Sequence, residues 1–162
     1  MKPANVMLMP DQQLAVIDFG VARLYKPGKP RDTIAFGSPG YAAPEQYGRA
    51  QTTPRSDIYS LGALLHQMLT GQDPSLNPFR FQLLSAYDRS LPVELEKLVA
   101  QMLETDMMQR PKNAEEVKRR LQLIATSRIV ARRRKTDTTR GATSSLPPLV
   151  SAAALARAFS TI

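Results

Sequence analysis

Two short hydrophobic runs near the start of the chain are separated by a polar turn. Residues 6–9 and 14–17 are apolar, and the Pro-Asp-Gln-Gln sequence between them favours a turn. This pattern predicts an antiparallel hairpin, with Asn5 just before its first strand and Asp18 just after its second. Because antiparallel pairing folds the chain back on itself, both residues are expected at the same end of the hairpin.

Helical periodicity dominates the rest of the chain. Apolar residues recur at three- and four-residue spacing over residues 55–70, which predicts a centrally packed helix with Ser56 as its N-cap and Gly71 as its C-terminal stop. Three further helices are predicted: a modest one over residues 79–87, one that begins at Pro92, and one capped by Asn113. The expected fold is therefore mainly α, with a short β-hairpin.

Composition narrows the class of protein. The 162 residues suffice for one domain with a sizeable core. The sequence contains no cysteine, so it has no disulfide scaffold, and this fits a reducing, cytoplasmic environment. It also contains no run of 18 apolar residues that would predict a transmembrane helix.

Charge divides the chain into two parts. Residues 1–117 carry 12 basic and 13 acidic side chains, whereas residues 118–162 carry 10 basic and one acidic. We therefore predict a globular part over residues 1–126 and a basic, disordered tail over residues 127–162. The tail is read as a charged linker, and the alternative is a cluster that attracts an anionic lipid surface or nucleic acid.

Five short motifs follow one another along the globular part. They are Lys2-Pro3-Ala4-Asn5, Asp18-Phe19-Gly20, the segment from Gly37 to Glu45, the segment from Ser56 to Gly62, and Arg110-Pro111. In this order and spacing they resemble the C-terminal lobe of a bacterial eukaryotic-like (Hanks-type) serine/threonine protein kinase, truncated at its N-terminus. The resemblance covers about residues 1–125 and implies a helical kinase C-lobe whose β-hairpin carries the metal ligands.

The resemblance implies transfer of the ATP γ-phosphate to protein Ser or Thr hydroxyls, with Mg²⁺, or alternatively Mn²⁺, as cofactor. It assigns Asn5 and Asp18 to the metal and nucleotide, Lys2 to the γ-phosphate and Ser38 to the placement of the acceptor hydroxyl. Hard Mg²⁺ suits an amide and a carboxylate combined with substrate phosphates. The local sequence alone also allows simpler interpretations, with Asn5 as a capping residue and Asp18 and Ser38 as turn residues.

Regulatory and structural roles follow from the same resemblance. Thr33 is the candidate for a regulatory phosphate that orders the loop, and the alternative is an ordinary loop residue. Glu45 is expected to form a buried ion pair with Arg110, and Asp57 to bond the backbone of the catalytic loop.

The family pattern H-R-D-x-K-P-x-N places Met1 at the first x, so the general-base aspartate would lie just before Met1. The glycine-rich loop and ATP-clamping lysine of the N-terminal lobe have no counterpart in the sequence either. We therefore expect a truncated gene model or gene remnant, inactive as an isolated chain. The alternative is a pseudokinase-like module that binds proteins without catalysis. Expected partners are ATP, a protein substrate and other kinase chains; nucleic acid is not expected, and membrane attachment would require segments outside this sequence.

Overall fold

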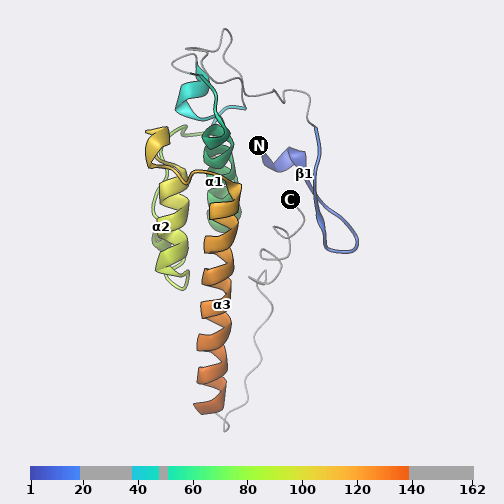
Figure 1. Ribbon diagram of the computed structural model, residues 1–162, viewed down its shortest axis with the longest axis vertical. Coiled ribbons are helices and arrows are strands. Elements are labelled where there is room, and N and C mark those ends of the chain that lie inside the picture. The colour runs from blue at the N-terminus through green and yellow to red at the C-terminus, as the bar shows by residue number, and fades with distance from the viewer. Residues whose placement is uncertain (19–37, 48–50, 139–162) are drawn as a thin grey trace.

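Three α-helices and a two-stranded hairpin form the computed structural model (Figure 1), which describes residues 1–18, 38–47 and 51–138. The strands are β1 (Val6–Leu8) and β2 (Leu14–Val16), and the helices are α1 (Pro54–Thr70), α2 (Val93–Met102) and α3 (Ala114–Thr138). Short 3₁₀ helices are η1 (Pro3–Asn5), η2 (Pro44–Tyr47), η3 (Leu84–Ala86) and η4 (Met107–Gln109). The prediction of a mainly helical fold with a short hairpin is confirmed.

The hairpin has the predicted antiparallel arrangement. Val6 pairs with Val16 and Leu8 with Leu14. At the turn, the Met9 amide donates to the Gln13 carbonyl (2.8 Å), and the Asp11 carboxylate accepts from the Gln13 amide. The side chain of Asp11 thus closes the turn locally, as aspartate commonly does.

Local sequence sets both ends of α1. The Thr53 side chain accepts from the Arg55 amide and the Ser56 hydroxyl accepts from the Thr53 amide, which together cap the first turn. The predicted N-cap, Ser56, is therefore one turn too late, because Thr53 and the following proline already start the helix. Gly71 ends the helix as predicted, in the left-handed conformation (φ 73°) that glycine adopts without strain.

The core lies where α1 and α2 meet and is closed by the first turns of α3. Its buried members are apolar side chains from these helices and from η3: Ile58, Leu65, Leu84, Leu98, Val99, Met102 and Val117. Gly62 allows the two helices to approach closely, because a Cβ at this position would lie 2.8 Å from the Cβ of Met102. The helical part is thus built on one hydrophobic core, with the hairpin beside it (Figure 1).

The last helix begins as predicted but extends further. The Asn113 side chain accepts from the Glu116 amide (2.9 Å), and the Glu116 carboxylate accepts from the Lys112 amide (3.0 Å). The helix then continues to Thr138, into the segment for which we predict a basic tail. The rest of that predicted tail, residues 139–162, lies outside the described residues. In the described part of the chain, no helix is both long and apolar enough to cross a membrane.

The helix predicted over residues 79–87 is wrong, because only η3, at residues 84–86, is helical there. Phe79 adopts a left-handed backbone (φ 64°), which interrupts any helix. Its ring lies edge-on to Tyr47 (5.4 Å between centroids), and that of Phe81 lies edge-on to His66 (5.1 Å). Contacts with residues distant in sequence therefore outweigh the weak local preference for a helix.

Two glycines with positive φ provide a matched test of the packing. A Cβ at Gly40 (φ 78°) would lie 2.3 Å from the backbone carbonyl carbon of Pro74, whereas one at Gly71 (φ 73°) meets nothing within 4 Å. We expect Gly71→Ala to lower the free energy of unfolding by about 1–2 kcal/mol for the strained backbone alone. Gly40→Ala should lower it by about 2–5 kcal/mol, because Pro74 must also move. Urea unfolding of both variants measures the difference, and equal losses would contradict the close approach.

Candidate functional site

The base of the hairpin holds three of the predicted site residues. The Ile17 amide donates to the Asn5 carbonyl (2.8 Å), which extends the strand pairing by one step and places Asp18 at the same end as Asn5. The Asn5 amide in turn donates to the Lys2 carbonyl (2.9 Å), so η1 keeps Lys2 nearby in the chain. Asn5 is half-buried, whereas Asp18 is exposed and adopts a left-handed backbone (φ 63°).

Asn5 and Asp18 fit a magnesium ion that is held mainly by a phosphate ligand. Within the described residues there is no group of three or more His, Cys, Asp or Glu side chains that would form an all-protein metal cage. Mg²⁺ in phosphoryl-transfer sites is commonly held by one or two protein oxygens, water and substrate phosphates. One amide oxygen and one carboxylate at the base of the hairpin match that donor set.

Ser38 lies on a separate, tightly turned loop. Its carbonyl accepts from the amides of Tyr41 and Ala42 (3.1 and 3.0 Å). The Tyr41 hydroxyl donates to the side chain of Gln67 on α1, which attaches the loop to the helical body. Among the described residues, no hydrogen bond joins Ser38 to Lys2 or Asn5.

Glu45 and Arg110 form a bidentate ion pair in the interior, in the arrangement that the resemblance implied. The two guanidinium nitrogens lie 2.7 and 2.9 Å from the two carboxylate oxygens, and both residues are buried. The Ser56 hydroxyl, at the start of α1, donates to the same carboxylate (2.6 Å). Burial alone would raise the pKa of the Glu45 carboxyl, but the hydrogen bonds from Arg110 and Ser56 outweigh it and hold the pKa below its usual range.

Every donor of the Arg110 guanidinium is used. Besides the two bonds to Glu45, it donates to the backbone carbonyls of Arg55, Glu104 and Thr105 at 2.7–3.2 Å. Its carbon lies 4.9 Å from the centre of the Tyr59 ring, within cation–π range. An arginine carries five N–H donors in a fixed fork, so this pocket is specific for arginine and would not be satisfied by lysine.

Of the remaining predicted residues, Asp57 lies near the N-terminus, and the others fall outside the described part of the chain. Asp57 was expected at the buried start of a helix with backbone partners, but it is exposed, and no hydrogen bond joins its side chain to another described residue. Partial desolvation raises the pKa of Asp57, while the positive charge at the N-terminus opposes the shift. Thr33 and the Phe19-Gly20 part of the second motif lie outside the described residues.

Sequence reasoning missed the contacts that support this region. It did not anticipate the bond from Tyr41 to Gln67, the bond from Ser56 to Glu45 or the Tyr59 ring beneath Arg110. The sequence could have indicated Tyr59, because it lies next to the apolar Ile58 in a helix predicted to be central. In the structure both side chains are buried. The partners of Tyr41 and Ser56 carried none, since they depend on tertiary structure.

Comparison with known proteins identifies the class. The model of the protein kinase domain matches residues 1–121. The chain is 31% identical over 137 residues to serine/threonine-protein kinase pkn2 of Myxococcus xanthus, covering 72% of this chain and 16% of that protein. It is 42% identical over 78 residues to serine/threonine-protein kinase A of Synechocystis, covering 45% of this chain and 15% of that protein. It is 35% identical over 74 residues to serine/threonine-protein kinase PknL of Mycobacterium tuberculosis, covering 45% of this chain and 18% of that protein.

The chain therefore belongs to the protein kinase family. It spans less than one fifth of the length of each of these three relatives.

The ion pair gives a stability prediction. Arg110→Leu leaves the Glu45 carboxylate buried without its partner, so we expect the free energy of unfolding to fall by about 3–5 kcal/mol. Replacing both Glu45 and Arg110 with methionine should recover part of this loss, because no charge is then left unpaired. Arg89→Leu, on the exposed surface, is the matched control and should change the free energy by no more than about 0.5 kcal/mol. Urea denaturation measures all three, and similar losses in Arg110→Leu and Arg89→Leu would rule out a structural role for the pair.

Proposed function

We propose that the chain is the C-terminal lobe of a serine/threonine protein kinase, which transfers the ATP γ-phosphate to a protein Ser or Thr hydroxyl. The observation that carries the proposal is the bond from the Ile17 amide to the Asn5 carbonyl. This bond sets an amide and a carboxylate at one end of a hairpin in a chain that belongs to the protein kinase family. The names of the three relatives support Ser and Thr, rather than Tyr, as acceptors.

Each proposed site residue has one task. Asn5 and Asp18 hold Mg²⁺, which when bound neutralises charge on the phosphates of ATP. Lys2 steadies the γ-phosphate. Ser38, on the loop that the Tyr41 hydroxyl attaches to α1, helps to place the acceptor hydroxyl of the substrate. A phosphate on Thr33 would regulate the site by ordering the surrounding loop. Such a site works mainly by positioning its reactants and offsetting charge.

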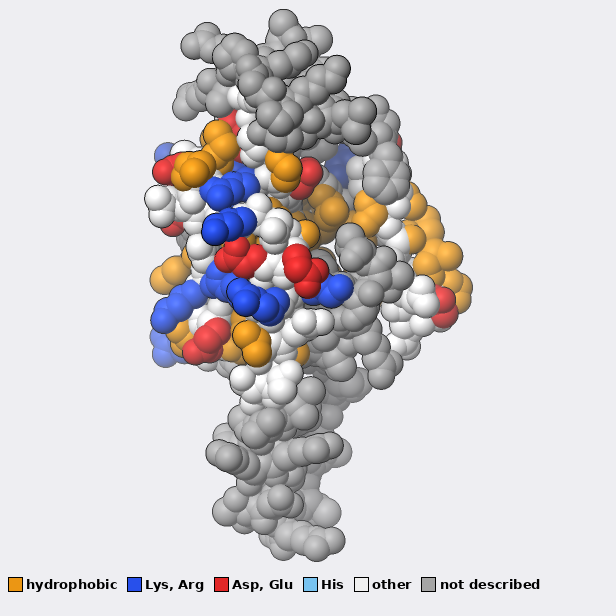
Figure 2. Space-filling view, in the orientation of Figure 1, with side chains coloured by type: hydrophobic (Ala, Val, Ile, Leu, Met, Phe, Trp, Pro, Cys, Tyr) orange, Lys and Arg blue, Asp and Glu red, His pale blue; other side chains and the backbone are white. Residues whose placement is uncertain are grey.

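A binding module without catalysis is the second candidate, and the hairpin surface favours it. The exposed hydrophobic side chains of this region include Met7, Leu8, Met9 and Ile17. Figure 2 shows a hydrophobic area at the right of the molecule, where Figure 1 places the hairpin, away from the mixed charges of the helices. An area of this kind suits a protein partner, for example the N-terminal lobe of a kinase or another kinase chain.

Metal binding can be tested without turnover. We expect Mn²⁺ with ADP to broaden the NMR signals of residues near Asn5 and Asp18 in the 162-residue chain, because a paramagnetic ion reveals weak binding. Asp18→Asn should abolish the broadening. Asp11→Asn removes the same charge from the opposite end of the hairpin and leaves an oxygen that can still accept from the Gln13 amide, so it should not change the signal. Broadening that survives Asp18→Asn, or none in the unchanged chain, would contradict the proposed metal site.

Catalysis by residues 1–162 alone is expected to be absent. Their sequence includes neither a residue at the general-base position of the family pattern nor an N-terminal lobe to enclose ATP. Incubation with Mg-ATP and casein, followed by mass spectrometry, should detect no phosphate transfer. Transfer that is measurable in the unchanged chain and lost in Asp18→Ala would overturn this expectation, and it would also exclude the binding-module alternative.

A further inference from the structure

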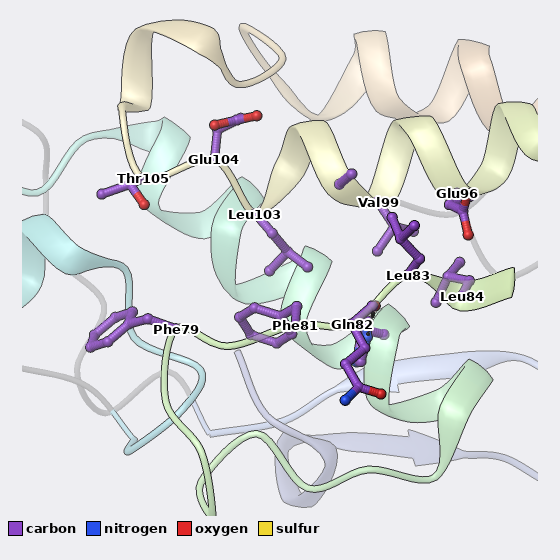
Figure 3. A pocket seen from close by; sticks show the side chains of 12 residues that line it. Phe79, Phe81, Gln82, Leu83, Leu84, Glu96, Val99, Leu103, Glu104 and Thr105 are labelled. Carbon is purple, nitrogen blue, oxygen red and sulfur yellow. Dashed lines mark hydrogen bonds between the residues drawn. The ribbon is translucent and has the colours of Figure 1, made fainter. Parts of the chain in front are cut away.

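A small hollow lies between α2 and the segment from Phe79 to Leu84, which precedes and enters η3 (Figure 3). Its volume is ≈ 190 Å³, and its apolar walls include Phe79, Phe81, Val99 and Leu103. Sites for drug-sized ligands and cofactors usually measure about 300–1,000 Å³. The hollow is therefore of a size for one or two side chains of a bound peptide and too small for a nucleotide.

The charged groups around the hollow have one sign. Glu96 and Glu104 line it, and no lysine or arginine is among its described lining residues. Bonds from Ser85 lower the pKa of Glu96, so that carboxylate is ionised at neutral pH. Glu104 follows the C-terminal end of α2, where the helix dipole places partial negative charge. The rim thus favours a cation next to an apolar group.

One wall of the hollow is held in a strained backbone conformation. Phe79 is a non-glycine residue with φ 64°. The residue is 46% exposed, and its ring contacts the Tyr47 ring edge-on. A strained residue persists only where its surroundings fix it, and such residues cluster at functional positions. Tyr47 ends η2, a few residues after the loop that carries Ser38. The hollow therefore lies beside the segment that the proposed function assigns to substrate placement.

We propose that this hollow docks a segment of the protein substrate in which an apolar side chain stands next to a lysine or arginine. The apolar side chain packs between Phe79 and Phe81, and the neighbouring cation faces Glu104. This inference rests on the proposed kinase function, since it names a class of substrate. It adds a binding determinant outside the metal and phosphate residues.

Direct peptide binding tests the docking site. The probe is a fluorescein-labelled 12-residue peptide with one Arg-Leu pair in a Gly-Ser background, and the comparison peptides carry Glu-Leu or Arg-Ser at the same place. We expect the Arg-Leu peptide to bind best to the 162-residue chain, with NMR shift changes at Phe79, Phe81 and Glu104. The affinity should fall as salt is raised, because the cation is recognised at an exposed site.

Matched variants separate the docking site from general charge effects. Glu104→Gln should weaken binding of the Arg-Leu peptide about 1.5- to fivefold, the range of an exposed ion pair. Phe79→Asn should weaken it about tenfold or more, because it removes the aromatic anchor while asparagine still tolerates the left-handed backbone. Glu94→Gln removes the same charge from α2 outside the hollow and should leave the affinity unchanged.

Three results would overturn the docking site: equal binding of the Glu-Leu peptide, equal losses in Glu94→Gln and Glu104→Gln, or shift changes confined to other residues. Tighter binding at the same residues by a peptide that copies residues 149–162 would assign the hollow to the chain's own C-terminal segment, and it would overturn the substrate assignment. The measurement uses no nucleotide or metal. Its failure is therefore distinct from failure of the Mn²⁺ titration, which tests the proposed function.

Discussion

The buried pair of Glu45 and Arg110 is the interaction on which the helical part of the molecule depends most. The Arg110 guanidinium donates to Glu45 in η2 and to the Arg55 carbonyl in the first turn of α1. It also donates to the carbonyls of Glu104 and Thr105, which follow the end of α2. One side chain thus ties together three elements that are far apart in sequence. Because all five donors are used, a side chain with fewer donors, such as lysine, would leave buried acceptors without a partner.

This anchor determines how rigidly the proposed substrate loop is held. With η2 fixed by Glu45, the preceding loop is attached to α1 by the Tyr41 hydroxyl and lies against Pro74 at Gly40. The hairpin that carries Asn5 and Asp18 is held together by hydrogen bonds within its strands, its turn and η1. Local bonds thus place the proposed metal ligands at one end of the hairpin, whereas the Tyr41 hydroxyl attaches the proposed substrate loop to a distant helix.

The sequence predicted those features that local chemistry decides. The hairpin follows from two apolar runs around a turn, α2 from its periodicity, the C-terminal end of α1 from Gly71, and the start of α3 from Asn113. It failed where distant residues decide. The segment at Phe79 is not helical, because its aromatic rings pack on Tyr47 and on side chains of α1, which no local pattern encodes.

The candidate site likewise has one part that sequence motifs identify and another that only tertiary packing forms. Lys2, Asn5, Asp18 and Ser38 could be named because phosphoryl transfer requires particular residue types in particular motifs, and Glu45 could be matched with Arg110 only through the family resemblance, since 65 positions separate them. The hollow beside α2 has no motif, because it arises from two carboxylates and two aromatic rings that tertiary packing brings together. Recognition of a protein substrate needs surface shape and charge that suit one partner. For that reason the chemistry of this family can be read from sequence, whereas its choice of substrate has to be sought in the folded structure.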